Sequence, residues 1–324
     1  MPKRPSGSRG GKKKQLYPWV GLFFLGLLVF SFYVGRSTVP RKPPVEKKTQ
    51  APRTVAQVHP VPAPVPSPKP LPKPAAPSAP KPLPPASEPS GPVFPHGRGK
   101  IAIVLDDWGY TLNQMPKLES IRQPVTVAVL PGLPHSEEVA QGAEAVGHEV
   151  ILHMPMEALD QNAPREGETL LTGMSRTKVL ELLSHSLSTV PTARGISNHQ
   201  GSKATSNAAL MATVLQETKR RGLYFLDSYV TNRSICEEAA RKIKVPFARR
   251  AIFLDNEQTT AGIQRQLVSL AQAASQKGQA IGIGHDRPVM LSVLQKAAPA
   301  LEKAGYTLVP VSDLTEVPHP RSRN

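Results

Sequence analysis

"IAIVLDDWGY" (residues 101–110) places two adjacent carboxylates, Asp106 and Asp107, directly behind five apolar residues. A continuous apolar run of this kind is typical of a strand buried on both faces, as the strands of parallel sheets are. Like charges side by side at the end of such a strand repel each other unless water, a cation or hydrogen-bond donors compensate them. The stretch therefore predicts a buried strand that ends in a pair of acids in need of a compensating partner.

The same pattern of a short apolar run followed by a helical pattern recurs along the chain. The further strand candidates are residues 125–131, 148–155, 195–202, 222–228, 247–255, 280–286 and 306–313. The helix candidates are residues 136–147, 175–190, 207–222, 234–243, 261–278 and 288–305. Alternating strands and helices favour a parallel α/β sheet, closed or open. Eight or so units in so short a segment predict a compressed β/α barrel.

Polar residues that can bind metals collect at the ends of these strands. In β/α barrels the functional groups lie at the carboxyl ends of the strands. One such residue would be ordinary, but here they follow strand after strand: Asp106, Asp107, His153, Asn198, His199, Asp227, Asp255 and His285.

The segment before the predicted barrel differs in composition. Residues 15–35 carry no charge and are long enough to cross a hydrocarbon core, so we expect a transmembrane anchor. The alternative, a cleaved signal peptide, lacks a convincing cleavage site. The denser basic cluster lies in residues 1–14, which predicts a cytoplasmic tail there and a C-terminal domain on the opposite, outer side of the membrane.

A proline-rich segment separates the anchor from the predicted barrel. Twenty of the 36 prolines fall between Pro40 and Pro95, so residues 36–97 are expected to form a disordered linker of extended polyproline II character. The folded domain is predicted at residues 98–317, and residues 318–324 are expected to be a disordered tail. The linker would hold the domain away from the membrane.

The charge distribution argues against a nucleic-acid partner. The chain has a formal net charge of +16, but the stretch from Arg98 to Glu316 contains 23 Lys+Arg and 22 Asp+Glu residues. The excess positive charge therefore lies outside the predicted domain. The charge balance of the domain gives no reason to expect a basic, nucleic-acid-binding surface on it. The single cysteine, Cys236, cannot form an internal disulfide and is interpreted as an ordinary buried thiol.

A divalent cation would compensate the paired aspartates. Zinc accepts carboxylate oxygen and imidazole nitrogen, and it leaves a position for water that becomes a nucleophile near neutral pH. If Asp107 and two histidines hold the ion, Asp106 is free to orient or deprotonate the water, and His285 could protonate a leaving group. Structural roles stay open for each residue: caps of the turn for the aspartates, and core, turn or capping positions for the histidines.

Six motifs in order resemble the divergent polysaccharide deacetylases, relatives of the carbohydrate esterases that deacetylate chitooligosaccharide and peptidoglycan. They are "IAIVLDDWG", "HEVILHMPME", "GISNHQGSKATSN", "GLYFLDSYVTNRS", "VPFARRAIFLDNE" and "AIGIGHDRPVMLSVL", within about residues 98–315. The resemblance implies a deformed (β/α)7-type barrel, a divalent metal that is usually zinc, and removal of an acetyl group from a sugar. It also implies that Asp106 is the base and Asp107 a metal ligand.

The chain departs from the better-known deacetylases in their second motif, which supplies two histidines four residues apart. Here His153 is followed at that spacing by Glu157. His199 is the preferred third ligand, because the nearby Gly201 would let the backbone approach closely, and Glu157 is the alternative. The predicted metal set is therefore Asp107, His153 and His199.

The later motifs imply the remaining roles. His285 matches the acid histidine, and Asp227 resembles the aspartate that helps to orient the arginine and histidine machinery. The arginine of the family matches Arg249, with Arg250 as the alternative, although Asp227 and either arginine could instead form a structural ion pair.

The expected function is a membrane-anchored, metal-dependent hydrolase that removes acetyl groups from an envelope or extracellular polysaccharide. The rival is a noncatalytic glycan-binding or scaffold module on the same barrel, and the missing second histidine is its best support. Retention of Asp106, Asp107 and His285 argues against the rival, because binding alone has little need of an acid and a base.

Overall fold

The structure is a computed structural model that describes residues 92–318. Its strands are β1 (Lys100–Trp108), β2 (Thr126–Val129), β3 (Glu149–Met156), β4 (Gly195–Gln200), β5 (Tyr224–Asp227), β6 (Phe247–Arg249), β7 (Ile252–Phe253), β8 (Gln279–His285) and β9 (Thr307–Leu308). Its helices are α2 (Met115–Glu119), α3 (Ser136–Ala145), α4 (Arg176–Ser188), α5 (Ala208–Arg220), α6 (Cys236–Ile243), α7 (Thr260–Lys277) and α8 (Pro288–Lys303), with short 3₁₀ turns at Ala204–Ser206 and Val311–Leu314.

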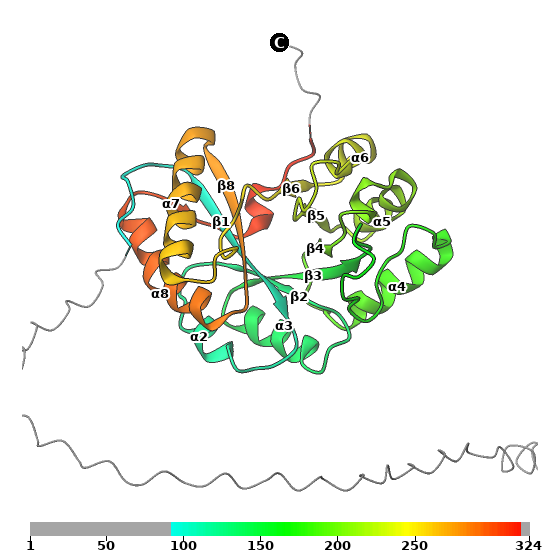
Figure 1. Ribbon diagram of the computed structural model, residues 1–324, viewed down its shortest axis with the longest axis horizontal. Coiled ribbons are helices and arrows are strands. Elements are labelled where there is room, and N and C mark those ends of the chain that lie inside the picture. Colours follow the sequence, from blue (N-terminus) through cyan, green and yellow to red (C-terminus); the bar gives the residue numbers. More distant parts are fainter. Residues whose placement is uncertain (1–91, 319–324) are drawn as a thin grey trace, which may run out of the picture. The chain divides into compact units, whose positions relative to one another are not determined.

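The strands form one parallel sheet that curves into a half-barrel, with the helices around its outside (Figure 1). The strand order is β6-β5-β4-β3-β2-β1-β8-β7, and β9 pairs with β1. The ends of this path, β6 and β7, are separated by Arg250 and Ala251 alone. The Arg250 amide donates to the Asp227 carbonyl of β5, and the Ala251 amide donates to the Ile281 carbonyl of β8. Two consecutive residues thus bond to strands near opposite ends of the strand order.

The expected parallel α/β architecture is confirmed, with two differences in its strands. The predicted strand at 247–255 is divided into β6 and β7, because the chain changes its pairing partner from β5 to β8 at Arg250. The predicted strand at 306–313 is mostly irregular: only Thr307–Leu308 pairs with β1, and a 3₁₀ turn follows.

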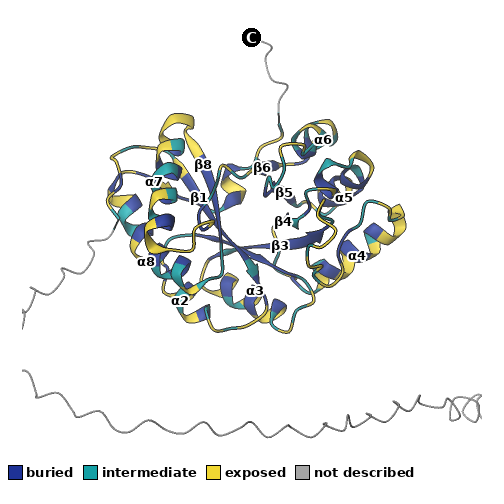
Figure 2. Cartoon of the chain, viewed as in Figure 1, coloured by how far each residue is buried: buried dark blue, intermediate teal, exposed yellow. Residues whose placement is uncertain are grey.

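Strand β1 is buried on both faces, as its apolar sequence predicts (Figure 2). Ile103 and Leu105 belong to an outer core cluster between the sheet and the helices. Val104 belongs to an inner cluster enclosed by the sheet, together with Ala102, Ala128, Ile151, Tyr224, Leu226, Ala248, Ile281, Ile283, Val309, Val311 and Leu314. Because side chains alternate along a strand, each position near a strand end can be assigned to the inner or the outer face.

Three helices begin at residues whose side chains cap the helix N-terminus. The side chains of Ser175, Asn207 and Thr259 accept hydrogen bonds from the backbone amides of the first turns of α4, α5 and α7. Helix α7 ends at Gly278, which adopts the left-handed conformation typical of a C-cap. The sequence did not predict α2, because five residues are too few to show a helical period.

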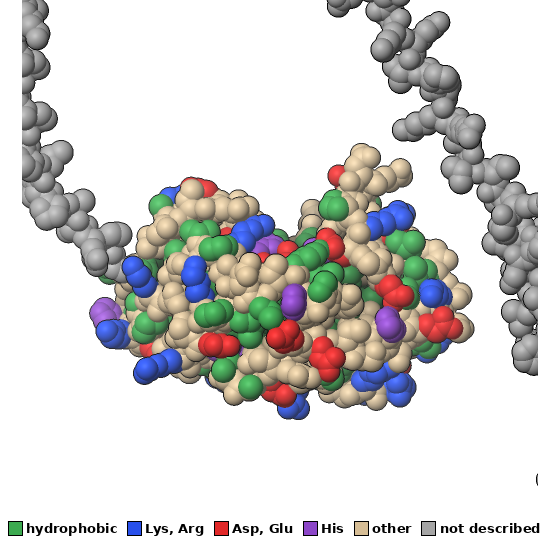
Figure 3. All heavy atoms as spheres, turned by 90° about the horizontal axis from the view of Figure 1, so that it is seen from below, with side chains coloured by type: hydrophobic (Ala, Val, Ile, Leu, Met, Phe, Trp, Pro, Cys, Tyr) green, Lys and Arg blue, Asp and Glu red, His purple; other side chains and the backbone are tan. Residues whose placement is uncertain are grey.

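Acidic and basic side chains are mixed on the face drawn in Figure 3, in line with the balanced charge of the domain. Within residues 92–318 no helix combines the length and the apolar character that a membrane span requires. The predicted anchor at 15–35 and the tail at 1–14 lie outside the described residues, as do most of the linker and residues 319–324. Phe94, in the predicted linker, is buried in the outer cluster.

Truncation of the β1 core should destabilise the domain. Leu105 is fully buried, so Leu105→Ala should lower the free energy of unfolding by about 2–5 kcal/mol through lost burial and a cavity. Leu159 is 54% exposed, and Leu159→Ala is expected to change the free energy of unfolding by less than about 0.5 kcal/mol. Denaturant unfolding of the two variants checks this, and equal losses would contradict the burial of β1.

Candidate metal and catalytic site

The two aspartates at the end of β1 converge on one histidine. Successive side chains of a regular strand point to opposite faces. Asp107, however, has a left-handed backbone with φ of 69°, and the register of β1 with β2 shifts between Leu105 and Trp108. As a result His153 Nε2 lies 3.4 Å from Asp106 Oδ2 and also 3.4 Å from Asp107 Oδ1.

The three predicted metal ligands lie together. His153 comes from β3 and His199 from β4, and His199 Nδ1 lies 2.9 Å from Asp107 Oδ1. One ligand atom from each of Asp107, His153 and His199 can be chosen so that all three lie within 4.8 Å of one another. One carboxylate oxygen and two imidazole nitrogens are a donor set that zinc and similar ions accept. The residues therefore fit a divalent metal.

Glu157, the alternative ligand, is engaged elsewhere. Its Oε1 accepts a hydrogen bond from Lys203 Nζ at 2.7 Å, and its Oε2 accepts from the amide and the hydroxyl of Thr172. Burial works against the ionised form, but these donors outweigh it and lower the pKa of Glu157 to about 2. Gly201 has φ of +88°, and a Cβ there would lie 3.0 Å from Met156 Cβ, which is the close approach that the sequence suggested.

The surroundings push the two aspartate pKa values in opposite directions. Burial raises the pKa of Asp106, and its Oδ1 is a buried atom with no hydrogen-bond partner among the described residues. Burial also opposes ionisation of Asp107, but hydrogen bonds from His153 and His199 outweigh it, so the pKa of Asp107 lies well below its usual range. Paired groups whose pKa values are separated in this way are typical of divided acid and base roles.

His285 faces the aspartates from β8. Its Nε2 lies 3.8 Å from Asp107 Oδ2, and its Nδ1 lies 2.8 Å from Asp255 Oδ1. Asp255 also accepts hydrogen bonds from the His285 amide and from Arg287 Nη1. Burial lowers the pKa of His285, but Asp255 outweighs it and the pKa lies above its usual value. His285 Nε2 is therefore the nitrogen that is available toward the site.

Asp227 does not hold His285. Its Oδ2 accepts a hydrogen bond from the Ser234 hydroxyl and its Oδ1 from the Tyr229 amide. Asp227 follows Phe225 of the outer cluster by two residues, so strand alternation places it on the outer face. The carboxylate that contacts the His285 ring is that of Asp255, and the orienting role that the resemblance implies for Asp227 stays a prediction.

Arg249 also lies outside the metal cluster. It follows Phe247 of the outer cluster by two residues, stacks 4.7 Å above the Tyr229 ring and donates to Glu237. Together with Asp227 it lines a second pocket of about 540 Å³.

Arg250 is the arginine on the inner face. It follows Ala248 of the inner cluster by two residues, and its guanidinium donates to the carbonyls of Ser228 and Tyr229. Burial lowers the pKa of Arg250, and the charges of Asp227 and Asp106 oppose that change. The guanidinium also stacks 3.5 Å above the Phe253 ring, so it is held by two carbonyls and an aromatic ring.

Two contacts at the site were not predicted from the sequence. The Ser197 hydroxyl lies 2.7 Å from His153 Nδ1, and Asp255 holds His285. The sequence marks Asp255 as a polar residue at the end of a predicted strand, but it suggests no role for that residue. Ser197 lies on an inner position of β4, and Asp255 follows Phe253, which packs against the inner cluster, by two residues. Counting the alternation from the apolar core residues is the signal that could have found them.

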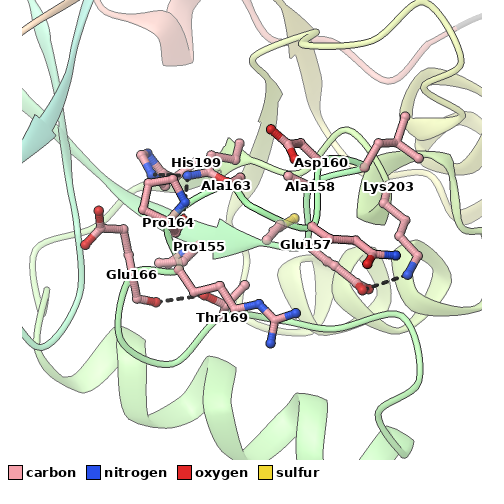
Figure 4. A pocket seen from close by; sticks show the side chains of 15 residues that line it. Pro155, Glu157, Ala158, Asp160, Ala163, Pro164, Glu166, Thr169, His199 and Lys203 are labelled. Atoms are coloured by element: carbon pink, nitrogen blue, oxygen red, sulfur yellow. Dashed lines mark hydrogen bonds and ion pairs between the residues drawn. The ribbon is translucent and has the colours of Figure 1, made fainter.

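A pocket of about 480 Å³ opens beside the third ligand, His199. Figure 4 shows His199 on one side of it and the Glu157–Lys203 ion pair on another. Its lining carries both hydrogen-bond donors and acceptors, including Asp160, Glu166 and Gln200. Such a lining suits a hydroxyl-rich ligand.

The family model of the divergent polysaccharide deacetylases matches residues 103–315, which contain all of these groups. The chain belongs to this family. The resemblance seen in the six motifs is thereby confirmed, and the family match runs from the β1 aspartates to beyond β9.

The chain is similar to two curated relatives and, among solved structures, to a protein of Agrobacterium tumefaciens. The uncharacterized protein YibQ of Escherichia coli K12 is 38% identical over 220 residues, which are 68% of each chain. An uncharacterized protein of Haemophilus influenzae is 33% identical over 202 residues, covering 62% of this chain and 72% of that one. The crystal structure of uncharacterized protein ATU2773 from Agrobacterium tumefaciens C58 aligns with a TM-score of 0.63 and 25% identity, covering 69% of this chain and 92% of its own.

Removal of the Asp255 charge should lower the pKa of His285. The Asp255 carboxylate stabilises the imidazolium, so Asp255→Asn should shift the titration of His285 toward lower pH and reduce its protonated fraction near neutrality. NMR titration of the His285 ring protons measures the shift. Asp313→Asn, at an exposed site, is the control, and an unchanged His285 titration in Asp255→Asn would contradict the pairing.

The Glu157 contacts should make stability depend on pH. Because the folded pKa is lowered, the contribution of Glu157 is present above its ordinary pKa of 4.5 and is lost as pH falls toward about 2. Glu157→Gln should therefore cost about 1 kcal/mol of unfolding free energy near neutral pH. Its deficit should shrink over that acid range in denaturant unfolding, whereas a constant deficit would show that the Lys203 pairing contributes nothing.

Proposed function

We propose that this protein is a metal-dependent hydrolase that removes acetyl groups from a polysaccharide of the cell envelope or the extracellular space. The observation that carries the proposal is the convergence of three metal-donor residues with a buried acid, Asp106, whose Oδ1 lacks a partner among the described residues. Membership of a deacetylase family supports the reaction class. The pocket beside His199, lined with donors and acceptors, supports a sugar as the ligand.

In this proposal Asp107, His153 and His199 hold a divalent ion, for which zinc is our choice. When bound, such an ion supplies Lewis acidity: it polarises a carbonyl and lowers the pKa of water. The barrel would correspond to the (β/α)7 type, with β6 and β7 sharing one strand position. Glu157 is not needed as a ligand because His199 supplies the second imidazole.

The side chains of the chain divide the proton transfers between them. Asp106 accepts a proton from the attacking water through its unpartnered Oδ1, and its raised pKa suits a general base. Water oxygen bonds to the acetyl carbon, and the bond from that carbon to the sugar nitrogen or oxygen breaks. His285 Nε2 donates a proton to the departing sugar atom, while Asp255 holds the opposite ring nitrogen. Acetate and the free amine or hydroxyl are the products.

We also propose that residues 15–35 anchor the chain in a bacterial inner membrane and that residues 36–97 carry the domain into the periplasm or beyond. The uncharged span and the denser basic cluster before it support this topology. Such a placement would bring the site to envelope polysaccharide.

Replacement of the proposed base separates catalysis from binding. In the zinc-loaded full chain, Asp106→Asn should reduce acetate release from acetylated peptidoglycan fragments or chitooligosaccharides by about 100-fold or more, with bound zinc retained. His199→Ala should lose both zinc and activity. Asp313→Asn, an exposed aspartate, is the matched control and should match the wild type.

Two results would overturn the proposal in different ways. Equal acetate release by wild type and Asp106→Asn would remove Asp106 from the chemistry. A wild-type chain that binds zinc and glycan but releases no acetate from any acetylated glycan tested would favour the noncatalytic glycan-binding module.

A further inference from the structure

Strand β4 presents two side chains toward the cluster. Ser197 and His199 are two residues apart, so they share a face of the strand, opposite to Ile196 of the outer cluster. His199 contacts Asp107, and Ser197 contacts His153. The Asn198 side chain, between them, bonds to backbone groups instead. Its Oδ1 accepts a hydrogen bond from the Ser228 amide, and its Nδ2 donates one to the Gln200 carbonyl.

The contact between Ser197 and His153 is fixed on both sides. The two residues are register partners across the β3–β4 pair, and both are buried, at 0% and 2% exposed respectively. Ser197 Oγ lies 2.7 Å from His153 Nδ1. His153 Nε2, at the other end of the ring, faces the carboxylates of Asp106 and Asp107. The imidazole is therefore held between one hydroxyl and two acids.

We infer that Ser197 is a positioning residue of the metal site, which fixes the tautomer and the ring orientation of His153. In this arrangement His153 Nδ1–H donates to the Ser197 hydroxyl, so the lone pair of Nε2 is presented to the ion beside Asp107. Outer hydrogen bonds of this kind typically contribute 10–100-fold to metal affinity. The inference rests on the metal site of the proposed function and concerns a residue that holds no ion itself.

The same geometry explains how the chain manages without an imidazole at position 157. One face of β4 supplies a ligand, His199, and the support for the other histidine ligand, Ser197. His199 contacts the Asp107 carboxylate directly, and Ser197 is linked to the carboxylates of β1 through the His153 ring. Loss of the Ser197 hydroxyl should therefore weaken metal binding.

Metal affinity of the full-length chain, measured by chelator competition with zinc, tests the inference. Ser197→Ala should weaken binding by about 10–100-fold, while Ser197→Thr, which keeps the hydroxyl, should bind more tightly than Ser197→Ala. Ser186→Ala is the matched control: Ser186 is 1% exposed, lies on α4, and its hydroxyl has no partner among the described residues. That control should bind zinc as the wild type does.

A purely structural role would give a different pattern. If Ser197→Ala lowers the melting temperature in EDTA but the folded variant binds zinc like the wild type, the inference is overturned. Failure of the wild type itself to bind zinc would overturn the proposed metal site and this inference together. Tight zinc binding by both wild type and Ser197→Ala would overturn only the inference.

A second measurement needs no variant and covers the case in which Ser197→Ala does not fold. Long-range ¹H–¹⁵N NMR of the zinc-loaded wild type, labelled at histidine, should show the His153 proton on Nδ1. A proton on Nε2 would contradict the inference.

Discussion

The site depends on how the end of β1 accommodates two consecutive carboxylates, one buried and one partly exposed. A regular strand would direct them to opposite faces, and one of them would then meet the apolar helices. The left-handed backbone of Asp107 brings both toward His153, where imidazole nitrogens compensate their charge. Strained backbone of this kind persists only where the surroundings enforce it, and it is common at functional sites.

That convergence also makes the two acids inequivalent. Asp107 receives hydrogen bonds from two histidines and is held ionised, whereas Asp106 is buried with one oxygen unpartnered among the described residues and resists ionisation. Each supporting histidine comes from a different strand, so the parallel sheet is what assembles the cluster. Ser197 contacts Nδ1 of His153, and Asp255 contacts Nδ1 of His285. In both histidines Nε2 is thereby left facing the site.

The sequence predicted the parallel α/β fold and most of the cluster because apolar runs and polar strand ends are local features. It placed Asp107, His153 and His199 in one set, which the structure brings together. It was less informative for Asp227 and Arg249, whose residue types matched but whose outer strand positions direct them to another pocket. The division of 247–255 depends on which strand each residue pairs with, a long-range property that no local pattern contains. The roles assigned to these residues stay predictions.

The central claim is that Asp107, His153 and His199 together hold a divalent ion at the end of β1. Anomalous diffraction at the zinc edge, from crystals of the protein grown with zinc, tests it most directly. The account predicts one peak at about 2.0–2.2 Å from a carboxylate oxygen of Asp107 and one nitrogen of each histidine. A zinc peak held by Glu157 in place of His199, or no peak within reach of Asp107, would contradict it.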